Sequence, residues 1–138
     1  MKSKSLNTAV ELAEKLEHVF VATGDPSGMP HVATAGKLSQ TSEGQVTVAA
    51  WFCPGTLANL KNNRKISLVV WDASLDKGHQ LLGRVEKVEE IAMMNGYSPE
   101  IDEATVMPQV KNRLLVRVDK VISFSHAPHS DLLEYSLS

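Results

Sequence analysis

The chain predicts a mainly β fold, a six-stranded antiparallel sheet that closes into a barrel, with an N-terminal helix and short connecting helices. Six β-prone segments alternate with polar turns, and most neighbouring segments are close enough to form hairpins. With 138 residues, 43% of them hydrophobic, the chain can bury the core of one domain. No internal repeat or linker divides it, so we expect one domain over residues 1–138.

The first segment is predicted to be a helix over Ser5–Glu17. Apolar residues recur there at helical spacing, namely Leu6, Ala9, Val10, Ala13 and Leu16. Thr8 and Glu11 stand three residues apart, as in a capping box at a helix start.

After this helix, the spacing of the apolar residues changes to the two-residue alternation that is typical of strands. Three of them are predicted, at Val19–Thr23, Pro30–Leu38 and Val46–Cys53. The polar turns Asp25–Gly28 and Thr41–Gly44 separate them, and each contains a glycine that tolerates positive φ. In the third strand, Val46 and Val48 fall on the same face.

A corner follows the third strand and leads into a short helix, predicted over Thr56–Asn63. Pro54 and Gly55 form this corner, and Thr56 begins the helix. Backbone N–H groups without intrahelical partners point outward at a helix start, so such a corner favours an anion.

The second half of the chain holds three more predicted strands, at Ile66–Trp71, Gln80–Glu89 and Asn112–Phe124. The first is apolar except at Ser67, which indicates burial on both faces. Between the last two, Tyr97–Gln109 is ambiguous, because Ser98 resembles a helix start and Pro108 ends any helix soon after. The tail, Ser125–Ser138, carries leucines that suit docking on the body or on a partner.

Composition excludes several functional classes. A formal net charge of −2 argues against nucleic acid or an anionic membrane as partner. No apolar run is long enough to span a bilayer, and the N-terminus lacks the apolar region of a secretory signal, so a cytoplasmic location is expected. The single cysteine, Cys53, excludes an intrachain disulfide and a Cys-rich zinc site.

Three blocks of sequence occur in an informative order, namely Gly28–Val32, Val46–Val70 and Gly83–Val88. The first is a turn into a strand. The second combines a strand, a corner, a short helix and an apolar strand, and the third is a glycine before an alternating strand. In this order they resemble the pyridoxamine 5′-phosphate oxidase-like FMN-binding split-barrel family. The resemblance is good across about residues 18–90 and loose across residues 112–124.

The resemblance implies a homodimer that holds two FMN molecules at the subunit interface. It places the phosphate near the corner and the isoalloxazine against the second and third strands. The cofactor-binding residues that it implies are Thr34, Ala35, Gly36 and Lys37 on the second strand, Ala49, Ala50 and Trp51 on the third, and Thr56 and Asn59 at the corner.

Two departures from the family pattern matter. Family members carry Lys or Arg at the corner, where this chain has Pro54, Gly55 and Thr56. A dianionic phosphate favours charge-assisted donors, so the missing cation leaves open whether FMN is retained. Lys37, Lys61 and Arg84 are the candidate cations that could reach the phosphate from elsewhere in the chain. The sequence also does not distinguish FMN from FAD, a deazaflavin or haem. The C-terminus also lacks the Arg-rich ending of the full oxidase, which argues against vitamin B6 oxidation.

Several residues have a structural interpretation beside the functional one. Thr56 suits a helix N-cap as well as a phosphate ligand, and Asn59 suits holding the corner loop. Trp51 suits the flavin ring, an interface or the core. We interpret Cys53 as a small buried apolar residue. Four of the five histidines, at positions 31, 79, 126 and 129, do not have the spacing of a metal site, and no metal site is expected.

The function hypothesis is a small FMN-dependent oxidoreductase in which hydride or electrons pass directly between a bound substrate and the flavin. No residue is a compelling acid, base or nucleophile, and the sequence does not name the substrate or electron donor. The alternative is a non-catalytic module that binds a flavin or another phosphorylated or planar ligand. A third interpretation is a structural dimer without cofactor, in which Thr56 is only a cap.

Overall fold

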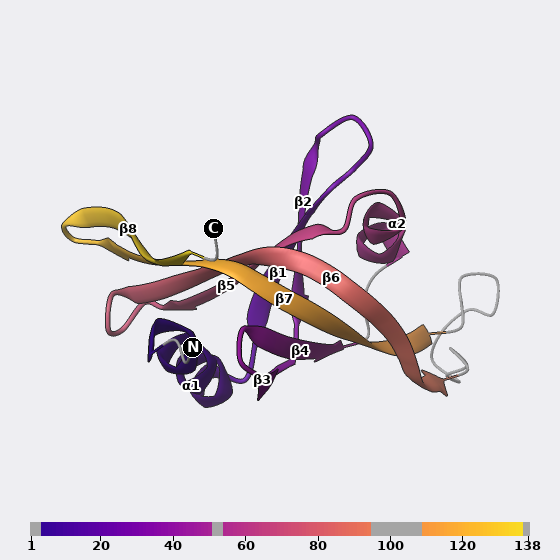
Figure 1. Ribbon diagram of the computed structural model, residues 1–138, viewed down its shortest axis with the longest axis horizontal. Coiled ribbons are helices and arrows are strands. Elements are labelled where there is room, and N and C mark those ends of the chain that lie inside the picture. The colour runs from indigo at the N-terminus through magenta and orange to yellow at the C-terminus, as the bar shows by residue number, and fades with distance from the viewer. Residues whose placement is uncertain (1–3, 51–53, 95–108, 137–138) are drawn as a thin grey trace, which may run out of the picture.

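The computed structural model describes residues 4–50, 54–94 and 109–136. Its two helices and eight strands follow the chain in the order α1 (Lys4–Leu16), β1 (Val19–Gly24), β2 (Pro30–Ala35), β3 (Lys37–Ser42), β4 (Gln45–Ala50), α2 (Pro54–Asn62), β5 (Lys65–Asp72), β6 (Lys77–Met94), β7 (Gln109–His126) and β8 (His129–Ser136) (Figure 1). Trp51, Cys53 and most of the ambiguous segment Tyr97–Gln109 lie outside the described residues.

All strand pairs are antiparallel, and the order across the sheet is β2-β1-β5-β6-β7-β4-β3, with β8 also paired to β7. The predicted mainly β, antiparallel fold is therefore confirmed. The strand count differs, because the described residues form eight strands where six were expected. The C-terminal tail, which was expected to dock on the body or on a partner, pairs with β7 of the body as β8.

The other added strand arises at Gly36, which divides the predicted strand Pro30–Leu38 into β2 and β3. The first part pairs with β1 and the second with β4. These two strands are also the two ends of the sheet order. The sheet was predicted to close into a barrel, but no hydrogen bonds join its two end strands. The covalent chain through Gly36 connects its two ends instead.

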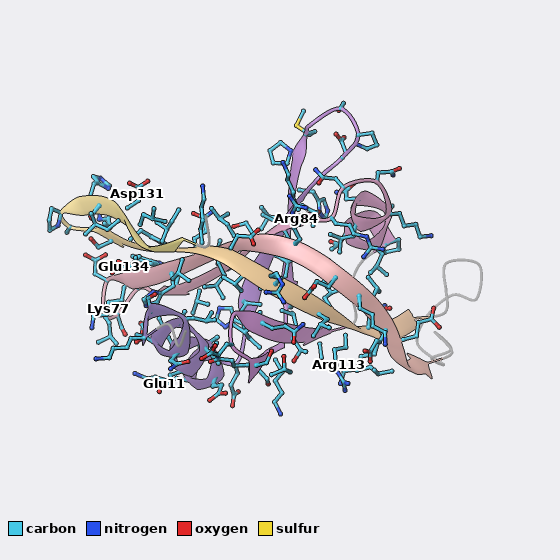
Figure 2. The ribbon with its side chains drawn as sticks, viewed as in Figure 1. Glu11, Lys77, Arg84, Arg113, Asp131 and Glu134 are labelled. Carbon is cyan, nitrogen blue, oxygen red and sulfur yellow. The ribbon has the colours of Figure 1, made fainter. Side chains whose placement is uncertain are left out.

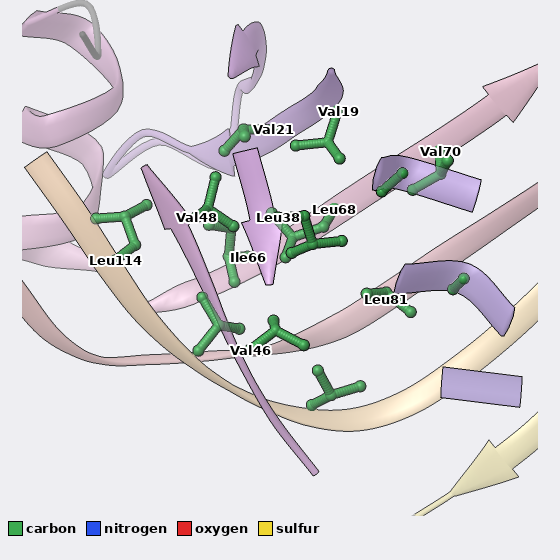
Figure 3. Packing of buried hydrophobic residues seen from close by; sticks show 14 of the residues in the cluster. Val19, Val21, Leu38, Val46, Val48, Ile66, Leu68, Val70, Leu81 and Leu114 are labelled. Carbon is green, nitrogen blue, oxygen red and sulfur yellow. The ribbon is translucent and has the colours of Figure 1, made fainter. Parts of the chain in front are cut away.

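The core lies on the concave face of the sheet (Figure 3). Alternate residues of the strands point there, as Val46 and Val48 of β4 do, and both are fully buried. α1 covers one part of this face through Leu6, Ala9, Val10 and Ala13, and α2 adds Leu60. Neither of the described helices is long and apolar enough to cross a membrane.

The opposite face of the sheet carries a continuous cross-strand row of side chains. Successive pairings align Thr34, Phe20, Val69, Gln80, Ile122 and Leu133 across six strands. Directly paired residues of an antiparallel sheet lie on the same face. The helix residues that pack into the core lie on the other side of the sheet. The row on the outer face is mainly apolar, and no helix among the described residues covers it.

Candidate functional site

The two predicted walls of the site meet at Gly36. A Cβ atom on this glycine would lie 3.3 Å from the carbonyl oxygen of Ala49, so the end of β2 and the end of β4 are in close approach. Ala35 is buried, whereas Thr34 is exposed on the outer face. The structure therefore brings Thr34, Ala35, Gly36 and Ala49 together, as small residues around one strand junction.

Lys37 belongs to the same junction, but its surroundings are those of α1. Its backbone pairs with Ala49, and its side chain lines a cavity of about 310 Å³ with Glu14 and Glu17, at the C-terminal end of α1. Ala50 ends β4 beside this junction. The predicted contact by Trp51 falls outside the described residues.

At the corner, the first two residues of α2 are exposed and the third is buried. Pro54 and Gly55 are exposed, while Thr56 is fully buried. The Asn59 side-chain amide donates a hydrogen bond to the Thr23 hydroxyl at 3.0 Å, and both residues are buried. Asn59 therefore ties α2 to β1, a structural role like the one weighed from sequence, although its partner is a strand rather than the corner loop. The ligand roles of Thr56 and Asn59 stay predictions.

His31 also lies at this corner, although the sequence did not indicate it. It pairs in register with Thr23, and its Nε2 would be 3.6 Å from a Cβ atom on Gly55. Its Nδ1 is buried and has no hydrogen-bond partner among the described residues. The sequence signal was the two-residue alternation that places His31 on the same face as Ala33 and Ala35, but the position of α2 above that face was not readable.

The other candidate cations lie elsewhere. Lys61 is in the last turn of α2, at the opposite end of the helix from Gly55. Arg84 of β6 pairs in register with Lys65 of β5, and its side chain is labelled in Figure 2. Lys65 borders a shallow cavity of about 290 Å³ that Asn63 and Gly24 also line.

A buried histidine, His79, lies away from the corner. It is 8% exposed and lines a cavity of about 380 Å³ with Thr8 and Ser123. Burial lowers the pKa of His79 from its ordinary value of 6.5, Glu134 opposes this shift and Lys77 adds to it. The native state therefore holds this imidazole neutral at neutral pH.

We expect the free energy of unfolding to fall as pH decreases below about 6.5, because the unfolded chain then takes up a proton that native His79 resists. Urea unfolding at several pH values between 7.5 and 5 measures this slope. The variant His79→Gln should flatten it, whereas His126→Gln, a change at an exposed histidine, should leave it unchanged. An unaltered slope in His79→Gln would show that other groups cause the pH dependence.

No three His, Cys, Asp or Glu side chains in the described ranges come together as a metal site. His126 and His129 do meet, with ring centroids 4.7 Å apart, in the hairpin between β7 and β8. The Asp76 carboxylate accepts hydrogen bonds from the backbone N–H groups of His126 and Ala127, at 2.7 and 2.9 Å. These bonds lower the pKa of Asp76 and fix the hairpin beside the β5–β6 loop.

The family model described as pyridoxamine 5′-phosphate oxidase matches residues 7–119. The chain belongs to the pyridoxamine 5′-phosphate oxidase family. The match covers all the residues of the candidate site, so the resemblance that the sequence indicated is confirmed. No curated protein matches this family member by sequence.

Solved structures share the fold of this pyridoxamine 5′-phosphate oxidase family member at low identity. A Clostridium acetobutylicum protein related to general stress protein 26 of B. subtilis aligns with a TM-score of 0.63 and 18% identity, over 96% of each chain. An FMN-binding protein from Syntrophomonas wolfei gives 0.61 and 18%, covering 88% of this chain and 87% of its own. A pyridoxamine 5′-phosphate oxidase-related, FMN binding protein from Nostoc punctiforme gives 0.59 and 11%, covering 94% and 88%.

Proposed function

We propose that this protein is an FMN-binding flavoprotein that works as a homodimer, with the flavin at the subunit interface. The observation that carries the proposal is the family match over residues 7–119, which includes both walls and the corner. Two structural neighbours that share the fold are themselves described as FMN-binding.

The residues present fit such a ligand. Gly36 has no side chain and Ala49 only a methyl group, so a planar ring could lie close to the backbone beside this junction. β2 is an end strand of the sheet order, so half of its N–H and C=O groups face away from β1 and can bind the polar edge of a ring. His31 and Ala35 lie on the same face of β2, and the strand spans about 13 Å between them, which suits a ligand with an anionic end and a planar end.

The outer face of the sheet supports a second copy of this chain as the partner. Phe20, Val69 and Ile122 are apolar members of its cross-strand row, with Gln80 between the last two, and no described helix covers them. Beside them, Met29 and Val32 are 64% and 62% exposed on the β1–β2 hairpin. Contiguous apolar surface of this kind marks an interaction site, and a two-fold dimer would bury the same patch on both subunits.

We infer that the activity is that of a small oxidoreductase, because a bound flavin supplies the capacity to accept and donate electrons. The wall residues Thr34, Ala35, Gly36 and Ala49 carry no acid or base. Their contribution would be to bind and orient the ring and to keep one of its faces from water. The substrate would reach the other face.

We expect the protein, after addition of FMN and desalting, to retain the two-band visible absorbance of a flavin. The absorption spectrum measures this directly, and a matched sample without FMN shows what the protein carries from expression. A protein that stays colourless after this treatment would contradict the proposed cofactor. Titration with FAD and a deazaflavin would then identify whether the site prefers a different flavin.

A non-catalytic flavin-binding module is the second candidate, and the first turn of α2 favours it. Pro54, Gly55 and Thr56 supply no positive charge there. Steady-state turnover with a nicotinamide donor separates the two candidates. An enzyme oxidises the donor repeatedly, whereas a carrier reacts at most once for each bound flavin.

A further inference from the structure

We propose that His31 recognises the phosphate of the flavin and makes the site select FMN over riboflavin. The inference rests on the proposed function, since it concerns the anionic end of the same ligand. It assigns to β2 a role that the family pattern gives to a Lys or Arg at the corner after the third strand.

The position of His31 is fixed relative to α2 through Thr23. Thr23 is the cross-strand partner of His31 on β1, and its hydroxyl accepts the 3.0 Å hydrogen bond from Asn59 of α2. Strand β2, strand β1 and helix α2 are thus joined at one point. A side chain at position 31 therefore keeps a constant relation to the start of α2, as a recognition residue requires.

Gly55 leaves space next to the imidazole. A Cβ atom there would lie 3.6 Å from Nε2 and 3.9 Å from Cε1 of His31, so the glycine leaves room for a ligand atom beside the ring. Gly55 is also exposed, which opens this space to solvent. The chain therefore has, at its corner, a small cradle with an imidazole on one side.

The imidazole has unused hydrogen-bonding capacity. Its Nδ1 is buried without a partner among the described residues, although a buried polar atom left unpaired is costly. No hydrogen bond to Nε2 occupies the side that faces Gly55, within the part of the chain that the structure describes. A phosphate is an acceptor of high charge that suits an imidazole N–H.

The positions of the other cations leave this role to His31. Lys37 lies beside Glu14 and Glu17 of α1, and Lys61 lies at the far end of α2. Arg84 stands opposite Lys65 on the β5–β6 pair. Of the four, His31 is the group whose ring nitrogen the structure places against Gly55.

The test compares two ligands that differ only in the phosphate. Affinities for FMN and riboflavin are measured by quenching of flavin fluorescence, on protein stripped of bound flavin. We expect His31→Ala to weaken FMN binding by about 10- to 100-fold, the range for a hydrogen bond to a charged group, and riboflavin binding by less than about twofold. His31→Arg should restore the preference for FMN, and the exposed control His126→Ala should bind both ligands as the wild type does.

Gly55→Ala is the second variant, which tests the cradle without touching His31. Its added methyl group makes only ordinary van der Waals contact with the ring, so the fold is retained. We expect this variant to lose FMN affinity and keep that for riboflavin. Thermal melts followed by circular dichroism confirm that each variant is folded, and if His31→Ala is not, the Gly55→Ala result decides.

Four results would overturn the inference. An unchanged preference for FMN in His31→Ala and Gly55→Ala would remove His31 from the phosphate site while the proposed function stands. An equal loss of both ligands would show that His31 only shapes the fold. Loss of the preference in Arg84→Gln alone would assign the phosphate to β6. A wild-type protein that binds neither FMN nor riboflavin would overturn the proposed function as well.

Discussion

Replacing Gly83 by alanine is expected to destabilise the protein by at least about 3 kcal/mol, a large effect for one methyl group. A Cβ atom at this position would overlap the backbone carbonyl oxygen of Arg117 on β7. Gly83 pairs with Val118 where the register of β6 and β7 shifts, so the two strands approach closely there. Because the obstructing atom is backbone, the clash is relieved only by moving the strands apart.

Urea unfolding monitored by circular dichroism measures this loss of stability. Gly24→Ala is the matched control, because a Cβ there would meet only the side chain of Asn63 at 3.7 Å. The control should change the free energy of unfolding by less than about 1 kcal/mol. Equal stability of the Gly83→Ala variant and the wild type would show that β6 and β7 are not packed as closely as described.

Introducing a charge at Val69 is expected to separate the proposed dimer into monomers. Val69 lies in the middle of the outer-face row, between Phe20 and Gln80. In Val69→Asp each subunit would place an unpaired carboxylate in a shared apolar interface. We expect the dimer dissociation constant to rise by more than about a hundredfold, since an uncompensated buried charge costs about 3–5 kcal/mol. Sedimentation equilibrium measures the constant.

Thr41→Asp adds the same charge at an exposed position of β3 and should leave the association unchanged. FMN affinity should fall together with dimerisation in Val69→Asp, because the proposed site lies between subunits. A wild-type chain that is monomeric at all concentrations would contradict the homodimer. A monomeric variant that binds FMN as tightly as the wild type would place the flavin within a single subunit.

Local sequence patterns predicted most of the elements. The alternation of Val46 with Val48, and of Leu114 with Val116, indicated β4 and β7, and the inward residues of both strands are buried as expected. Apolar spacing and the Pro-Gly corner likewise placed α1 and α2 within about two residues of their observed ends. These patterns depend on near neighbours in the chain.

The caps expected at the two helix starts were wrong. Thr8 lies inside α1, where its hydroxyl donates a 2.9 Å hydrogen bond to the Lys4 carbonyl oxygen. Thr56 is the third residue of α2.

The two added strands could not be predicted in the same way. The alternation through Pro30–Leu38 continues across Gly36, so no local signal shows that β2 and β3 pair with different partners. In β8, Leu132 and Leu133 are adjacent and both are mostly exposed, so the strand shows no buried face. Its existence depends on pairing with β7, which is a tertiary interaction.

The proximity of the second-strand and third-strand residues was predictable, but the orientation of their side chains was not. Family order indicated the junction at Gly36 and Ala49, which the structure brings together. The environment of Lys37 depends on α1, and the hydrogen bond of Asn59 depends on where α2 lies against β1. His31 was missed for the same reason, since its relation to Gly55 exists only after β2 and α2 have packed.

The division of the sheet at Gly36 has a consequence for how this junction can vary. The two sides of the junction belong to different hairpins, β1–β2 and β3–β4, which share one peptide connection and no ladder of hydrogen bonds. Each hairpin can therefore shift without forcing its neighbour out of register, while position 36 itself must stay small beside the Ala49 carbonyl oxygen. A fold arranged in this way can change the spacing between two hairpins while the pairing within each hairpin stays intact.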